Sequence, residues 1–185
     1  YWEDARPIPL TGEEAWDYHR RDSIMRLHNS KEYLDSVDHA SNKPKIMQVV
    51  FNGYFYDRRY NHFSIGVSPL ITAVSYNTVQ GIRPALGLSM NKSWENNKFL
   101  NVNPDFSYGV SGKKFYSDIE LNYYYKPVKF SRITLAGGSK TSQFSERDPI
   151  GVFVNTNYTL IEKRNYMKIY AKKDAEGSYH TEIVN

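Results

Sequence analysis

Three acidic residues come nearest in this sequence to a catalytic pattern: Asp105, Asp118 and Glu120. Carboxylates that lie close together can share general acid and general base roles. These three fall on the polar positions of two successive predicted strands, where charge that faces water is the ordinary arrangement. No activated nucleophile accompanies them. We therefore predict no catalytic residues and no enzyme activity.

Three histidines suggest a metal site by residue type but not by spacing. His19 and His28 are nine residues apart, and His28 and His39 are eleven apart. No pair therefore has the i, i+4 spacing of a helical metal site, and surface or packing roles explain these residues better. The sequence has no Cys, which excludes disulfides and thiolate zinc sites. We predict neither a metal nor a cofactor.

Two glycine-containing segments fit turns. Residues 109–114 (GVSGKK) resemble a phosphate-binding loop, but the first spacer is too short and no Ser or Thr follows the Lys, so a hairpin turn is the better interpretation. Residues 76–81 (YNTVQG) fit a turn that starts the next strand. The alternative for residues 76–81 is an inner loop that touches a substrate.

The composition favours a β-rich protein. Sixteen Tyr, nine Phe and three Trp are residues that strands prefer. Mean hydropathy is −0.64, and no run of eighteen apolar residues predicts a membrane-spanning helix. The net charge of +4 comes from scattered Lys and Arg without a dense basic stripe. A nucleic-acid partner is therefore not expected.

The first part of the chain, residues 1–44, is predicted to be an extended lead-in followed by helices. Pro7 and Pro9 disfavour helix before residue 10. Thr11 and Glu14 form a capping-box pattern that begins a helix over about residues 12–28. Ser30 can cap a second, shorter helix that ends near residue 39. These helices fit three roles equally well: a plug, a dock for a periplasmic partner, or a linker packed on a barrel mouth.

In residues 45–185 the hydrophobic period changes from 3.6 to 2, which predicts antiparallel strands. Alternation is unbroken over residues 82–90 and 100–111, and it continues with the opposite parity over residues 115–125. Weaker β-segments are expected at residues 46–56, 63–67, 133–139, 152–160, 165–173 and 179–183. Short polar turns at residues 94–98, 110–114 and 161–165 join about nine segments into an up-and-down meander.

Alternation alone does not decide whether the apolar face meets lipid or a protein core. Strands of ten to twelve residues and aromatic residues near their ends favour a transmembrane barrel over a soluble sheet. In the barrel, the lumen-facing candidates are Asn101, Asn103, Asp105, Asp118, Glu120 and Asn122. The lipid-facing candidates are Leu86, Leu88, Val102, Phe106 and Val110.

Four segments together carry a family resemblance: residues 1–14 (YWEDARPIPLTGEE), Asp22-Ser23, residues 33–38 (YLDSVD) and residues 76–81. In this order they resemble a Bacteroidota outer-membrane protein family of unassigned function. The resemblance implies a signal peptide and a carboxypeptidase-regulatory-like domain ahead of a C-terminal barrel. It also implies that this chain is a middle fragment, and it supplies no catalytic residues.

The sequence therefore predicts an all-β fold: an incomplete portion of an antiparallel up-and-down transmembrane β-barrel, preceded by a short helical segment. The expected location is the outer membrane, with the lipid bilayer and other outer-membrane or periplasmic proteins as partners. The expected role is non-enzymatic, in transport or in assembly of surface components. The alternative is a soluble β-rich binding module for a ligand such as carbohydrate, with exposed tyrosines as stacking platforms.

Overall fold

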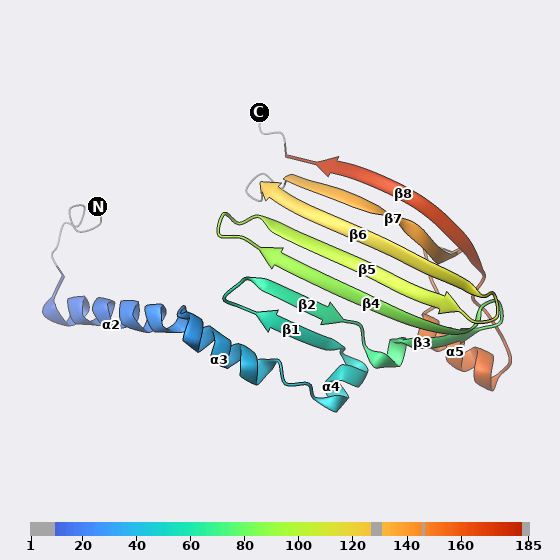
Figure 1. Cartoon of the computed structure of the whole chain (residues 1–185), viewed down its shortest axis with the longest axis horizontal. Coiled ribbons are helices and arrows are strands. Elements are labelled where there is room, and N and C mark those ends of the chain that lie inside the picture. Colours follow the sequence, from blue (N-terminus) through green and yellow to red (C-terminus); the bar gives the residue numbers. More distant parts are fainter. Residues whose placement is uncertain (1–9, 127–130, 146, 183–185) are drawn as a thin grey trace.

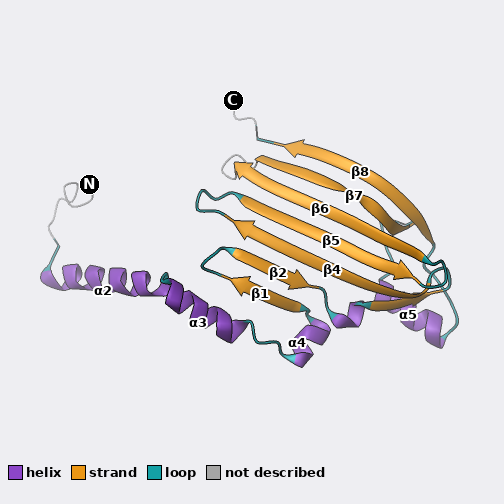
Figure 2. Cartoon of the chain, in the orientation of Figure 1, coloured by secondary structure: helices purple, strands orange, loops and turns teal. Residues whose placement is uncertain are grey.

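A computed structural model describes residues 10–126, 131–145 and 147–182, and it is mostly one antiparallel β-sheet with a few helices (Figures 1 and 2). The helices are α2 (Gly12–His28), α3 (Lys31–Ser41), α4 (Ile46–Phe51) and α5 (Val152–Ile161), with one 3-10 turn, η1 (Leu70–Thr72). The strands are β1 (Tyr54–Arg58), β2 (Phe63–Val67), β3 (Val74–Asn77), β4 (Gly81–Ser93), β5 (Phe99–Gly109), β6 (Lys114–Lys126), β7 (Ser131–Gln143) and β8 (Ile169–His180).

The two predicted helices at the start of the chain are confirmed. Thr11 and Glu14 form the capping box of α2, in which each side chain accepts a hydrogen bond from the other residue's backbone N–H. The Ser30 side chain caps α3 by accepting from the Tyr33 N–H. In Figure 1, α2 points away from the sheet, and Trp16 is 64% exposed. The extended lead-in, with Pro7 and Pro9, lies outside the described residues.

The sheet follows the predicted up-and-down order. Strands β4 to β8 are neighbours in sequence order, and every pair is antiparallel. Both β2 and β3 pair with β4, along different halves of it, so they act as one strand interrupted by η1. Among the described residues, β1 and β8 are the two edges, and the sheet is not closed into a barrel.

The register between strands keeps apolar side chains on one face of the sheet and polar side chains on the other. Val102 of β5 lies opposite Leu121 of β6, which lies opposite Leu135 of β7. Asn101 lies opposite Asn122, which lies opposite Thr134. Residues that oppose each other in an antiparallel pair point to the same face. Strands β4 to β8 therefore have an apolar face and a polar face.

Most of the sheet is a single layer. The chain exposes 14096 Å², whereas a compact folded protein of 21.6 kDa exposes about 9,200 Å². Among the described residues, the buried hydrophobic side chains are Tyr116 and Met167. Figure 2 shows α2, α3 and α4 beside one edge of the sheet and α5 at one end of it, so that most of the sheet has no helix over it. The sheet therefore lacks the internal core of a sandwich.

The β-segment predicted at residues 152–160 is wrong, and the one predicted at residues 46–56 is wrong in its first half. Residues 46–51 form α4, and Gly53, with a φ of +87°, separates this helix from β1. Residues 152–160 belong to α5, where Asn155 and Thr159 are buried one helical turn apart. Their β-propensity is overridden by tertiary hydrogen bonds. Residues 161–165 therefore follow a helix. Segments expected at residues 165–173 and 179–183 are one strand, β8, over the described residues.

Gly138 occupies a position that other residues fit poorly. It has a φ of +151°, and an added Cβ would lie 2.2 Å from the Ser117 carbonyl oxygen across the β6–β7 pair. We expect Gly138→Ala to lower the free energy of unfolding by about 2 kcal/mol or more, because backbone strain and a backbone clash combine. Denaturant unfolding measures this loss.

Gly177→Ala is the matched control, because an added Cβ there meets only Leu135 Cδ2, at an ordinary 3.5 Å. Equal stability of the two variants would contradict the register drawn between β6 and β7.

Candidate functional site

The polar face of the sheet carries a ladder of side-chain amides. Asn101 Nδ2 donates to Asn91 Oδ1 at 2.7 Å, and Asn103 Nδ2 donates to Asn101 Oδ1 at 2.6 Å. Asn91 also donates to Ser64 Oγ at 3.3 Å. These residues come from β2, β4 and β5, and alternation places them on one face. The amides therefore bond to one another in a row that crosses the sheet.

The ladder has a second hydrogen-bonded part on β6 and β7, which the β5–β6 register places beside the first. Asn122 Nδ2 donates to Glu120 Oε1 at 2.6 Å, and Thr134 Oγ1 donates to Asn122 Oδ1 at 2.7 Å. Glu120 lies directly opposite Asn103. Of the predicted lumen-facing residues, Asn101, Asn103, Glu120 and Asn122 thus belong to this ladder.

A charged row runs beside the ladder, nearer to α5. It consists of Arg83, Asp105, Asp118, Lys140, Lys172 and Asp174, all at polar-face positions of β4 to β8. Asp105 and Asp118 are direct cross-strand partners, an arrangement that is destabilising for two like charges. Lys140 Nζ lies 3.1 Å from Asp118 Oδ2, and Lys172 Nζ lies 3.3 Å from Asp174 Oδ2. The Lys140–Asp118 ion pair offsets the repulsion between Asp105 and Asp118.

A cavity of about 230 Å³ opens within the charged row, lined by Arg83, Asp105, Ser107, Tyr116, Asp118 and Lys140, among others. Arg83 Nη2 donates to Ser107 Oγ at 3.1 Å. The cavity offers both donors and acceptors, and its acids are balanced by cations. This arrangement can bind ions or polar solutes weakly, by charge and hydrogen bonding.

Of this row, sequence reasoning found only Asp105 and Asp118. It expected Asp105, Asp118 and Glu120 on the polar face of adjacent strands. In the structure, Asp105 and Asp118 lie directly across from each other, and Glu120 belongs to the amide ladder. Arg83 and Lys140 were not singled out. Both occupy polar positions in their strands, so strand parity combined with register would have placed them beside the acids.

The opposite face is apolar and lies between aromatic side chains at its two ends. The predicted lipid-facing residues of β4 and β5 lie on it, and Leu86 opposes Phe106 while Leu88 opposes Val67. Near α5 the aromatic residues are Phe106, Tyr108 and Phe115. Val110 is exposed in the turn that follows β5.

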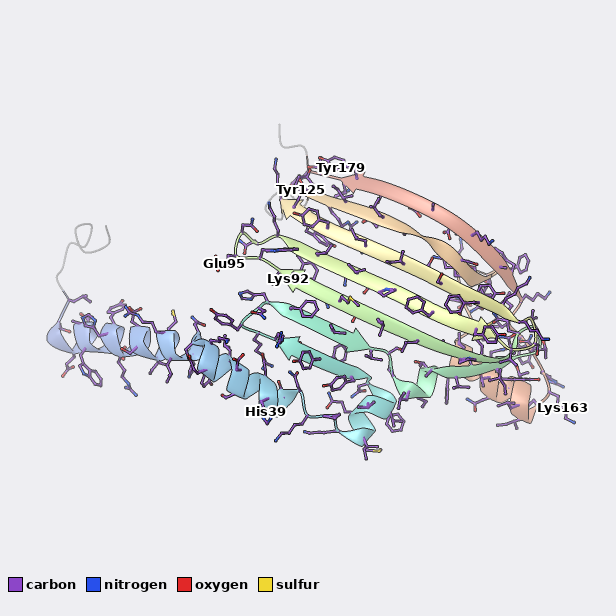
Figure 3. The ribbon with its side chains drawn as sticks, in the orientation of Figure 1. His39, Lys92, Glu95, Tyr125, Lys163 and Tyr179 are labelled. Atoms are coloured by element: carbon purple, nitrogen blue, oxygen red, sulfur yellow. The ribbon has the colours of Figure 1, made fainter. Side chains whose placement is uncertain are left out.

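At the other end of the apolar face the aromatic residues are Trp94, Tyr123, Tyr125 and Tyr179. The Trp94 and Tyr123 rings meet edge to face at 6.3 Å. The Tyr125 and Tyr179 hydroxyl oxygens are 2.6 Å apart, and Figure 3 shows the two residues side by side where β6 and β8 meet this end. A hydrophobic band therefore runs between two aromatic groups.

Residues 150–168, called here the α5 segment, were missed as a site by sequence reasoning. Asn155 is 1% exposed, and its Oδ1 accepts from the Tyr166 and Met167 N–H groups at 3.0 and 3.1 Å. This side chain holds the loop that follows the helix, at residues 166–167, against the helix. An i, i+4 pair of polar residues, Asn155 and Thr159, between apolar neighbours was the available signal.

The turn at residues 76–81 holds the α5 segment against β3. Thr156 Oγ1 accepts from the Tyr76 N–H at 3.1 Å, and Asn165 Nδ2 donates to Thr78 Oγ1 at 2.7 Å. Asn77 Oδ1 accepts from the Val79 and Gln80 N–H groups, which makes the turn itself. Residues 76–81 thus form the turn that starts β4, as predicted, and they also hold the α5 segment in place.

The structure shows the surroundings of two of the three histidines for which surface or packing roles were predicted. The His28 ring stacks on Tyr33 with centroids 4.6 Å apart, and His39 lies in the last turn of α3. Within residues 10–126, 131–145 and 147–182, no group of three or more metal-ligating side chains gathers. In the same part of the chain, no helix is long and apolar enough to cross a membrane.

Comparison with known proteins identifies a family. The model of the C-terminal domain of a family of unknown function (DUF5686) matches residues 47–185. No curated protein and no solved structure matches the chain. The matched region includes every strand of the sheet and the α5 segment.

Lys140 is expected to stabilise the sheet by compensating the opposed Asp105 and Asp118. Lys140→Ala removes the ion pair to Asp118 and leaves the two carboxylates opposed, so we expect a loss of about 1 kcal/mol in the free energy of unfolding. The double variant Lys140→Ala/Asp118→Asn should recover most of this loss, because the repulsion is removed.

Denaturant unfolding of the single and double variants measures the effect. Lys114→Ala, at an exposed position where β6 begins, is the control and should change little. A double variant less stable than Lys140→Ala would contradict the compensation.

Proposed function

We propose that this chain, which belongs to a family of unknown function (DUF5686) by its match to the family's C-terminal domain, contributes its sheet to the wall of an outer-membrane β-barrel. In this proposal the apolar face of β4 to β8 contacts lipid, and the polar face lines a hydrated lumen. The role is non-enzymatic, in transport or in assembly of surface components.

The observation that carries the proposal is the pairing of an uncovered apolar face with a hydrogen-bonded polar face. Leu86, Ile119 and Leu135 are 44%, 48% and 52% exposed on the apolar face. An apolar face that is exposed over several neighbouring strands marks a lipid or protein interface. A soluble sheet would hide the apolar side under a second layer, and the described residues supply none over it.

The dimensions agree with a bilayer. Phe115 and Tyr123 belong to the two aromatic groups and are eight residues apart on β6. That spacing corresponds to about 26 Å along the strand, and to about 20 Å across a membrane if the strand is tilted by roughly 40°. Barrel proteins carry a comparable apolar band, about 25 Å tall, between aromatic girdles.

The polar face supports a passive role better than a chemical one. Its amides bond to one another, and its charged groups form ion pairs at Lys140–Asp118 and Lys172–Asp174. Such a surface solvates passing ions and polar solutes. The resemblance of the sequence to Bacteroidota outer-membrane proteins, in which a carboxypeptidase-regulatory-like domain precedes the barrel, supports the same location. Outer-membrane or periplasmic proteins are the partners that this role implies.

Two neighbouring residues of β5 test the proposal, because the sequence contains no native Cys. Val102→Cys and Asn103→Cys, each labelled with an environment-sensitive fluorophore, place the probe at one depth on opposite faces. In liposomes that contain nitroxide-labelled lipid, we expect strong quenching at residue 102 and weak quenching at residue 103, because only the apolar face meets acyl chains.

Equal quenching at the two positions would overturn the lipid-facing assignment. A monodisperse, soluble protein in which neither probe is quenched would instead favour a soluble binding module.

A further inference from the structure

The connection between β7 and β8 differs from the other connections between long strands. The β5–β6 turn comprises residues 110–113, whereas β7 ends at Gln143 and β8 begins at Ile169. The α5 segment occupies most of this longer connection. At its start, the Gln143 side chain bonds the backbone of Ile150 in both directions, at 2.8 and 3.0 Å. The connection is therefore attached to β7 before α5 begins.

The α5 segment then reaches the polar face on the far side of the sheet. A cavity of about 290 Å³ between helix and sheet has Val152 and Phe153 of α5 on one wall, and Arg83, Gly87 and Asp105 on the other. These sheet residues all occupy polar-face positions of β4 and β5. In Figure 1, α5 lies behind β3, at the end where the β5–β6 turn is found. The helix thus faces the Arg83 and Asp105 end of the charged row across this cavity.

Hydrogen bonds between distant residues hold the segment there. Tyr76 and Thr156 are joined, as are Thr78 and Asn165, across 80 and 87 residues of sequence. Within the segment, Asn155 is buried and accepts from two backbone N–H groups. A loop that only connected two strands over the surface would need none of these contacts.

We propose that the α5 segment is a constriction of the lumen, which it narrows above Arg83 and Asp105. This inference rests on the proposed function, because it takes the polar face as the lumen. The helix limits the size of the solute that passes. The charged groups beneath it require the solute to be polar and hydrated, a small ion or an uncharged polar molecule.

Two asparagines of α5 form a matched pair for the test. Asn155 fastens the segment through the Tyr166 and Met167 N–H groups, whereas Asn157 donates only to Phe153 O within the helix. In planar bilayers that contain the full natural protein, we expect Asn155→Ala to raise single-channel conductance by about twofold or more, because the segment opens locally. Asn157→Ala should leave conductance unchanged.

An engineered cross-link distinguishes local opening of the α5 segment from misfolding of the Asn155→Ala variant. The side chains of Thr78 and Asn165 meet at 2.7 Å, and native Cys is absent. In the Asn155→Ala background, the added pair Thr78→Cys/Asn165→Cys should return conductance to the wild-type level when oxidised. Reduction of the disulfide should raise conductance again. A misfolded variant would not respond reversibly to oxidation.

The outcomes separate this inference from the proposed function. Equal, wild-type conductance in the Asn155 and Asn157 variants overturns the constriction. The constriction is also overturned if no variant conducts while a probe at residue 102 is quenched by lipid. That result would still support the proposed barrel wall. An unquenched probe at residue 102 overturns the proposed function itself, and the constriction with it.

Discussion

The structure depends on a register that keeps strand parity aligned across the sheet. A strand presents alternate residues to opposite faces, so a slip of one residue between neighbours would exchange their faces. In the middle of the β5–β6 pair, apolar residues oppose apolar ones and polar residues oppose polar ones, as at Val102–Leu121 and Asn101–Asn122, whereas mixed pairs such as Lys92–Leu100 and Phe106–Ser117 lie nearer the strand ends. The tight turns help to set this register, with Asn97 and Lys113 in left-handed backbone conformations. Both faces of the molecule follow from that alignment.

Stability in such a sheet comes from its strand ladders and from whatever covers its faces. With few buried hydrophobic residues in the described part of the chain, the usual transfer of apolar area into a core contributes little here. A bilayer around the apolar face would supply the missing apolar environment, and hydrogen-bonded amides would tolerate water on the other face. The polar network is therefore a structural element as well as a candidate lining.

The free edge of β1 shows how the helical part connects to the sheet. The Asn42 side chain accepts from the Asp57 N–H and donates to the Asp57 carbonyl, both at 2.8 Å, as a neighbouring strand would. Asp38 is 7% exposed and accepts from the Arg59 N–H and from its guanidinium. These contacts cover part of an edge that would otherwise attract another strand. They fix α3 beside β1, and α2 projects beyond it.

Local signals in the sequence determined most of the sheet. Alternation over β4, β5 and β6 is long and regular, and the capping patterns at Thr11 and Ser30 use contacts within four residues. These features depend on the chain alone, because side-chain periodicity and caps are local. The opposition of Asp105 and Asp118 followed from the turn between their strands.

Only the tertiary structure decided the α5 segment and the completion of the charged row. Residues 152–160 carry β-branched and aromatic side chains that favour a strand locally. They form a helix because Asn155 and Thr156 bond to backbone groups at residues 166, 167 and 76. Arg83 and Lys140 join the acids through the pairings of β4 with β5 and of β6 with β7, whose register the alternation within one strand does not give. A single sequence carries no direct record of contacts across 80 or more residues, such as Tyr76–Thr156 and Thr78–Asn165, so the docking of the α5 segment had to come from the folded chain.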